Sequence, residues 1–246
     1  MINIFISDLH LSGHRPKLTA LFQAFLAWLD QSQATLYILG DLFAAWIGDD
    51  APDPAMTPVI VKLKQLSVNG HKIYIMHGNR DFLLSDHFFS ATGCQLLADP
   101  SLILIHERKT LLCHGDTLCS DDIAYQQFRR QVRDPHFIQS FLSKTISERV
   151  AIAKHLREKS SEEVAGKAQY IMDVNEQAVE QLMHEFAVDR LIHGHTHRLA
   201  IHDITVDNHP AQRIVLGDWQ DNRGNYLSFD KNQFNLRSFP SGEALV

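Results

Sequence analysis

Apolar and polar positions alternate along the N-terminal part of the chain in a way that predicts strands separated by helices. Nearly continuous apolar runs at residues 2–6, 36–39 and 72–76 are typical of strands that are buried on both faces. The segments between them, residues 15–31 and 59–68, carry apolar side chains at helical spacing. This strand–helix–strand–helix–strand order implies right-handed crossovers, so we predict a parallel sheet.

The remainder of the chain follows a different pattern. Its expected elements are a hairpin at 102–105 and 110–113, helices through 121–187 with a break at 160–166 and a further helix at 171–186, and strands at 191–192, 200–206, 213–216, 226–229 and 234–239. We therefore predict one α/β domain, residues 1–246, in which two mixed β-sheets pack face to face as an α+β sandwich flanked by helices. Residues 121–170 are expected to form a helical insert over one edge of this sandwich.

Polar side chains stand at the ends of five predicted strands. They are Asp8 and His10, Asp41, Asn79, His114, and His195 with His197. Ligands of α/β sheets bind where the carboxyl ends of parallel strands meet, so we expect these side chains to lie together. Each has an ordinary alternative, such as turn formation at Asn79 or a structural histidine at His114. Those alternatives would have to hold independently at five strand ends, which favours one shared site.

The chemistry of this set indicates a pair of divalent ions. Two ions about 3.5–4 Å apart form a clamp used in phosphoester chemistry. Ions that close repel each other, so a carboxylate must lie between them, and we predict that Asp41, directly after Gly40, is this bridge. Carboxylate, amide and imidazole ligands without a thiolate favour Mn²⁺, Fe²⁺, Zn²⁺ or Co²⁺ over Ca²⁺ or a structural cysteine–zinc site.

The charge and the cysteine content indicate which binding partners and which cellular compartment to expect. The net charge of −6 argues against general nucleic-acid binding, yet residues 121–170 hold nine basic and seven acidic side chains. This local excess indicates an anionic ligand or an anionic membrane surface at the insert. Three cysteines without a CxxC pair favour reduced thiols in a cytosolic protein. We expect no signal peptide, because the chain begins with a predicted strand and reaches Asp8 within eight residues. We expect no transmembrane helix, because no apolar run reaches about 18 residues.

Five motifs resemble the sequence blocks of the calcineurin-like metallophosphoesterases. They are Asp8-x-His10, Gly40-Asp41, Gly78-Asn79-Arg80-Asp81, His114-Gly115 and Gly194-His195-Thr196-His197. The resemblance implies the metallophosphoesterase fold, with one ion held by Asp8, His10, Asp41 and His197. It implies that a second ion is held by Asp41, Asn79, His114 and His195.

Arg80 departs from the common form of the superfamily motif, in which a histidine follows the asparagine and assists the leaving group. An alkoxide leaving group needs a proton donor, whereas a phosphate leaving group is a weak base that needs charge stabilisation. The planar cation of arginine suits phosphate oxygens. We therefore expect cleavage of a pyrophosphate rather than of a simple phosphoester.

Longer motifs narrow the resemblance to the UDP-2,3-diacylglucosamine hydrolases, which act in lipid A biosynthesis in Gram-negative bacteria. The matching segments are residues 8–11, 37–43, 45–50, 77–84, 114–119, 171–175 and 191–198. The resemblance implies two Mn²⁺ per chain and hydrolysis of UDP-2,3-diacylglucosamine, by attack on the α-phosphorus, to UMP and 2,3-diacylglucosamine 1-phosphate (lipid X). It also implies a peripheral membrane protein on the cytoplasmic face of the inner membrane, and we expect a monomer.

The same resemblance assigns roles to single residues. Catalysis would depend on Asp41, Arg80 and His195. Substrate contacts would be made by Asn79, Arg80, Asp122, Tyr125, Ser160, Lys167 and His195. Val164 replaces a polar residue of the family and cannot donate a side-chain hydrogen bond, which puts that one contact in doubt.

The apolar side chains of the insert would line a trench for two acyl chains over the active site, with plain helix packing as the alternative. They are Phe128, Phe137, Ile138, Phe141, Leu142, Ile146, Val150 and Ile152. Arg149, Arg157 and Lys167 are the basic neighbours expected to meet phosphate or anionic headgroups. Two rival functions stay open: another calcineurin-like enzyme (a phosphodiesterase or protein phosphatase), and a non-catalytic binding scaffold. Arg80 and the insert count against the first, and seven intact ligand positions count against the second.

Overall fold

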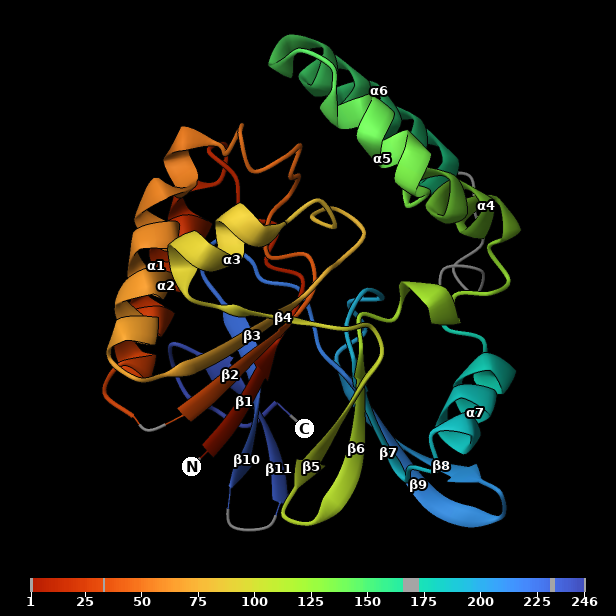
Figure 1. The fold of residues 1–246 in the computed structure, drawn as a ribbon. Helices are drawn as coiled ribbons and strands as arrows, with labels where there is room; N and C mark the ends of the chain where they lie inside the picture. Colours follow the sequence, from red (N-terminus) through yellow and green to blue (C-terminus); the bar gives the residue numbers. More distant parts are fainter. Residues whose placement is uncertain (1, 33, 166–172, 231–232, 246) are drawn as a thin grey trace.

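Two β-sheets packed face to face form the centre of the protein in a computed structural model, which describes residues 2–32, 34–165, 173–230 and 233–245 (Figure 1). The first sheet has the strand order β11-β10-β1-β2-β3-β4, and the second has β5-β6-β7-β9-β8. The strands of the first sheet are β1 Ile2–Ile6, β2 Ala34–Leu39, β3 Lys72–Met76, β4 Gln95–Leu97, β10 Gly224–Asp230 and β11 Gln233–Phe239. Those of the second are β5 Ser101–Ile105, β6 Arg108–Cys113, β7 Arg190–His193, β8 Ala200–Val206 and β9 His209–Val215.

Both sheets are mixed, as the sequence predicts. In the first sheet β1, β2, β3 and β4 run parallel, and β10 and β11 continue it in antiparallel fashion. In the second sheet β6, β7 and β9 run parallel, with β5 and β8 antiparallel at its edges. Loops that follow several parallel strands can therefore meet at one edge of the sandwich.

The two faces of the parallel strands bury different side chains. Phe5 and Leu39 point into the space between the sheets, where they pack with Leu112 and Ile192 of the second sheet. Neighbouring positions on β1 and β2 instead pack under helices α1 Pro16–Leu29, α2 Thr57–Val68 and α3 Asp86–Thr92. Helix α7 Glu176–Glu185 covers the outer face of the second sheet (Figure 1). Burial on both faces explains why the apolar runs of the parallel strands are continuous rather than alternating.

A helical insert extends over one edge of the sandwich (Figure 1, green). It consists of α4 Ile123–Val132, α5 Pro135–Leu142 and α6 Ile146–Ala165. Within the described ranges, no helix combines the length and the apolar character needed to cross a membrane.

Several predicted boundaries are wrong. The break expected at 160–166 is absent at least to Ala165, because α6 continues through a Ser-Ser-Glu-Glu segment that an established helix can extend across. The helix expected from residue 171 begins at Glu176, where the side chain of Asn175 accepts a hydrogen bond from the N–H of Ala178 at 3.0 Å. Strand β9 begins four residues before the predicted start, since Pro210 is accommodated opposite Thr205 in its pairing with β8. The short elements α3 and β4 are missing from the prediction.

Candidate two-metal active site

The loops after five strands, three from the first sheet and two from the second, bring the predicted ligands to one edge. Backbone hydrogen bonds tie these loops together: the N–H of Asp8 donates to the carbonyl of Gly40 at 3.2 Å, and that of His10 to Asp41 at 2.9 Å. The N–H of Gly194 donates to the carbonyl of His114 at 2.9 Å. The positions of the side chains are therefore fixed by main-chain contacts between separate strands.

Five of the seven predicted ligands have left-handed backbone conformations. Their φ values lie between 51° and 65°, at Asp8, His10, Asp41, His195 and His197. A non-glycine residue in this region costs of the order of 1–3 kcal/mol, and such strain persists where surrounding structure enforces it, often at functional sites. This repeated strain is an independent mark of a site at the edge.

Asp8, His10 and His197 form a compact group. Nε2 of His10 and Nε2 of His197 are 3.4 Å apart, and Nε2 of His197 is 3.3 Å from Oδ1 of Asp8. Oδ1 of Asp8 and Nδ1 of His10 are buried and have no hydrogen-bond partner in the described parts of the chain. Buried acceptors without donors are costly, and a cation placed among them would satisfy both.

Asn79, His114 and His195 form the adjacent group. Oδ1 of Asn79 lies 2.9 Å from Nε2 of His114 and 3.0 Å from Nδ1 of His195. Nδ1–H of His114 donates to the carbonyl of Leu39 at 2.9 Å, so in the neutral ring Nε2 faces Asn79 with a lone pair. Such an arrangement of acceptors fits a shared cation, and its oxygen and nitrogen atoms suit a divalent transition metal.

Asp41 lies between these groups. Its Oδ2 is 3.6 Å from Nδ1 of His10, and its carboxylate belongs with Asp8 and His114 to a cluster whose ligand atoms lie within 4.8 Å of one another. Asp8 also belongs to a second such cluster, with His10 and His197, so it is common to both. The placement of Asp41 is compatible with the bridging role, which stays a prediction.

The charges of the site also favour cation binding. Burial, together with Asp81 and Asp8, raises the pKa of Asp41 to about 7. Burial lowers the pKa of His114, but the carboxylates of Asp41, Asp116 and Asp8 outweigh it and raise that pKa to about 9, so a metal ion would displace a proton from this ring. Burial lowers the pKa of His10 to about 3 and that of His195 to about 4, so both rings are neutral and able to bind metal near pH 7.

Asp81 is a functional candidate that the sequence reasoning missed. It is fully buried, and its carboxylate accepts the N–H groups of Gly78 at 2.9 Å, Asp41 at 3.3 Å and Phe43 at 3.2 Å. These bonds connect the loop after β2 with the loop after β3. The available signal was its place in the Gly78-Asn79-Arg80-Asp81 block, although nothing in a single sequence shows that its partners are backbone groups.

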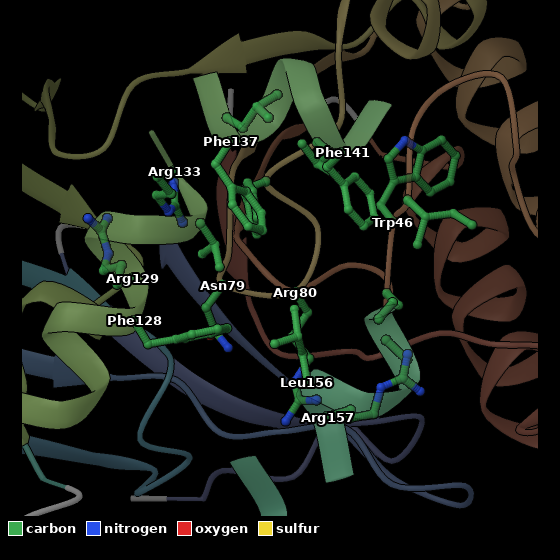
Figure 2. Close-up of a pocket in the computed structure, with 18 of the residues that line it drawn as sticks. Trp46, Asn79, Arg80, Phe128, Arg129, Arg133, Phe137, Phe141, Leu156 and Arg157 are labelled. Atoms are coloured by element: carbon green, nitrogen blue, oxygen red, sulfur yellow. The ribbon is translucent and has the colours of Figure 1, made fainter. Parts of the chain in front are cut away.

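The loops that carry the predicted metal ligands, after β1, β2, β3, β6 and β7, are called the metal loops below. A cavity between these loops and the insert adjoins the site (Figure 2). The metal side contributes Asn79 and Arg80, and α4 contributes Tyr125 and Arg129. Much of the remaining wall is apolar, from Ala44, Ala45, Trp46, Ile47, Phe82, Leu83, Phe128, Val132, Phe137, Ile138, Phe141, Ala153 and Leu156. Arg133 and Arg157 complete the lining. The cavity thus joins a polar end at the metal ligands to an apolar interior.

The structure separates the predicted trench residues into two sets. Phe128, Phe137, Ile138 and Phe141 line the cavity. Ile152 is not part of its wall, and Leu142, Ile146 and Val150 are 40%, 49% and 51% exposed on the surface of the insert. Periodicity alone could not separate these sets, because the apolar stripe of a short amphipathic helix extends beyond the face that packs against the rest of the protein.

The residues predicted to contact phosphate or substrate also fall into two sets, those that line the cavity and those that contact other parts of the chain. Arg157 lines the cavity near Arg80, whose charge together with burial lowers the pKa of Arg157. Arg149 does not face the cavity: Nη1 donates to the carbonyl of Ile47 and to Oδ1 of Asp50, each at 2.7 Å. Asp122 caps α4 by accepting the N–H of Tyr125 at 3.0 Å. The side chains of Ser160, Val164 and Lys167 lie outside the described residues.

Comparisons with known proteins show the family and the fold of the chain. The model of the calcineurin-like phosphoesterase family matches residues 4–199. A UDP-2,3-diacylglucosamine hydrolase of Haemophilus influenzae (strain PittGG) is 47% identical over 228 residues, which cover 93% of this chain and 94% of that protein. One of Serratia proteamaculans (strain 568) is 45% identical over 240 residues, 98% of this chain and 100% of that protein. A solved archaeal phosphodiesterase has a TM-score of 0.51 at 12% identity, over 97% of this chain and 100% of that chain, which shows a shared fold alone.

Proposed function

Because the chain belongs to the UDP-2,3-diacylglucosamine hydrolase family of calcineurin-like phosphoesterases, we propose that it hydrolyses the pyrophosphate of UDP-2,3-diacylglucosamine. The products would be UMP and 2,3-diacylglucosamine 1-phosphate, as required for lipid A biosynthesis. The observation that carries the proposal is the continuity between the predicted metal ligands and the largely apolar cavity, with Asn79 and Arg80 at their junction. A diacylated sugar nucleotide has the same division into a charged and an apolar part.

The residues of the chain supply charge and orientation for this reaction. Divalent ions held by Asp8, His10, Asp41, Asn79, His114, His195 and His197 would stabilise negative charge on the phosphates and activate the attacking water. Arg80 is 40% exposed and its Nε lies 3.9 Å from Oδ2 of Asp41, so its guanidinium can reach a phosphate beside the metal site. Arg157 lies near it, and two neighbouring cations favour binding of a multiply charged leaving phosphate.

The finer assignments belong to the same proposal. We infer two Mn²⁺ per chain from the two ligand groups around Asp41. Peripheral attachment to the inner membrane is supported by the exposed apolar side chains Leu142, Ile146 and Val150, which lie close in sequence to Lys144. A monomer is the simplest form compatible with a site whose proposed ligands all come from one chain.

The experiment that tests the reaction uses ¹⁸O-labelled water. The purified protein is incubated with UDP-2,3-diacylglucosamine and Mn²⁺, and the products are separated for mass spectrometry. We expect one labelled oxygen in UMP, because attack on the α-phosphorus places the water oxygen there. Label in the sugar phosphate would instead place attack on the β-phosphorus, and the absence of UMP would reject the activity.

A further inference from the structure

Asp116 lies where the metal loops meet the insert. It follows the His114-Gly115 turn after β6 and begins the short 3-10 helix Asp116–Leu118, and its side chain is fully buried. Its Oδ2 accepts hydrogen bonds from the hydroxyl of Tyr125 at 2.9 Å and from Nε of Arg129 at 2.6 Å. Both partners belong to α4, so a carboxylate carried by a core loop makes its side-chain hydrogen bonds to the insert.

The spacing of the partners explains how one carboxylate can orient a whole helix. Tyr125 and Arg129 are four residues apart and share one face of α4, and Arg133 continues that face by another turn. Nη2 of Arg133 lies 4.0 Å from Oδ2 of Asp116 and donates to the carbonyl of Gly78 at 2.9 Å. The side chain of Gln126 donates to the carbonyl of Asp116 at 2.8 Å. The inner face of α4 is therefore attached to the loops after β6 and β3.

The same residues form the end of the cavity beside the metal ligands. Tyr125, Arg129 and Arg133 line the cavity, and the ring centroid of Tyr125 is 5.7 Å from that of His195. Burial raises the pKa of Asp116, but His114, His195 and Arg129 outweigh it and lower that pKa well below its usual range. Burial and the charge of Asp116 raise the pKa of Tyr125, so its hydroxyl remains a donor.

We infer that Asp116 is a positioning residue, which sets the place of α4, and with it Tyr125 and Arg129, relative to the metal ligands. Its consequence for catalysis depends on the proposed function, whereas the physical link does not. A displacement of reacting groups by about 1 Å can lower a rate by about a hundredfold. A contact that fixes the cavity relative to the predicted metal ligands therefore matters for turnover.

The test starts from Asp116→Asn, which keeps the size of the side chain and removes the charge that pairs with Arg129. Asp189→Asn is the matched control. Asp189 forms an ion pair with Arg108 and directly precedes the first residue of β7, at the end of the strand away from the metal loops. Hydrogen–deuterium exchange then reports on α4 in both variants without any substrate. We expect amides of α4 to exchange about tenfold faster in Asp116→Asn, the size expected for a weakened hydrogen bond to a charged group, and to be unchanged in Asp189→Asn.

Two substrates separate positioning of the insert from support of the metals. Cleavage of UDP-2,3-diacylglucosamine should fall at least about tenfold in kcat/KM. Cleavage of bis(p-nitrophenyl) phosphate with Mn²⁺, a small diester that does not need the acyl chamber, should change less than about threefold. Equal losses for both substrates would place the role of Asp116 in the metal loop and overturn the inference, as would unchanged exchange in α4.

Further variants decide the outcome if Asp116→Asn does not fold. Tyr125→Phe removes one hydrogen bond to Asp116 without leaving a buried charge unpaired, and should also accelerate exchange in α4. If Asp116→Asn does fold, adding Arg129→Met to it should accelerate exchange in α4 little further, because both changes break the same contact. Additive effects would contradict the link. If the wild-type protein releases no UMP, the proposed function fails, but the exchange data still decide whether Asp116 holds α4.

Discussion

The metal loops and the insert are attached to the protein in different ways. The metal loops are joined by backbone hydrogen bonds between strands, as between Asp8 and Gly40, and their left-handed residues are held in one conformation. Among the described residues, the polar contacts of the insert with the core are made largely by side chains, notably Arg129, Arg133 and Arg149. The geometry of the ligands therefore depends on backbone pairing, whereas the place of the insert depends on a few side-chain contacts.

The largest effect should come from Asp41, the carboxylate proposed to bridge the two ligand groups. Asp41→Asn keeps the shape of the residue but removes the negative charge between the two ligand groups. We expect kcat to fall by more than about a thousandfold, because the two proposed ions would lose a common ligand. Mn²⁺ stoichiometry from calorimetry should fall at the same time, with circular dichroism unchanged. Near-normal turnover would contradict the bridging role.

A smaller and more selective effect is expected at the junction of the two regions. Arg80→His replaces a fixed cation by a group suited to protonating an alkoxide. Pyrophosphate cleavage should fall by about a hundredfold, while cleavage of a simple diester with Mn²⁺ should persist. The ratio of the two rates, measured in the same preparation, is the decisive quantity. A variant that cleaves the pyrophosphate at the original rate would reject the role of Arg80.

Within the insert, the cavity wall should matter more than the exposed surface. Phe141→Ala removes a buried ring, 7% exposed, that stacks on Phe137 at 6.4 Å between ring centroids. We expect KM for the diacylated substrate to rise about tenfold, since a large apolar contact is lost. Val150→Ala is the control, because Val150 lies outside the cavity and is 51% exposed. Equal effects of the two variants would argue that the cavity does not bind the acyl chains.

The smallest effect is expected at the outer attachment of the insert. Arg149 on α6 contacts Asp50 and the carbonyl of Ile47, and its approach requires Gly48, where a Cβ would lie 2.5 Å from Nη1 of Arg149 and φ is 127°. Arg149→Met should speed exchange in α6 a few-fold, with kcat/KM changed less than about threefold, because Asp50 is largely exposed.

This attachment should also depend on pH. The hydrogen bond from Arg149 lowers the pKa of Asp50, so the contact is present above the ordinary aspartate pKa of about 4 and weakens as pH falls through the lowered value. Exchange in α6 measured from pH 7 downward should show this loss in the wild type and not in Asp50→Asn. An identical pH profile for both proteins would contradict it.

The sequence predicts the metal loops better than the insert, for a physical reason. Asp8, Asp41 and His114 each follow an apolar run, so their strand ends could be located from pattern alone. The left-handed backbone of Asp8 and Asp41 could not, because nothing in the local sequence demands positive φ at these two residues. The role of Asp81 is hidden for a related reason, since two of its three partners, the N–H groups of Asp41 and Phe43, belong to the loop after another strand.

The insert is harder to predict from the sequence, because its contacts depend on how its helices are placed rather than on periodicity. Arg149 and Arg157 lie eight residues apart on α6, yet one contacts Asp50 and the other faces the cavity. A basic residue near an apolar stripe is therefore insufficient to predict a phosphate contact. The continuation of α6 to Ala165, where a break was expected, shows the same dependence on helical context.

We propose that the metal site and the apolar cavity act on one substrate. The most direct measurement compares UMP release, with Mn²⁺, from UDP-2,3-diacylglucosamine and from UDP-glucosamine without acyl chains. We predict a preference of at least about a hundredfold in kcat/KM for the diacylated substrate, because acyl groups buried in the cavity contribute binding energy that the shorter compound lacks. Equal kcat/KM values for the two compounds would show that the cavity does not bind the acyl chains of the substrate.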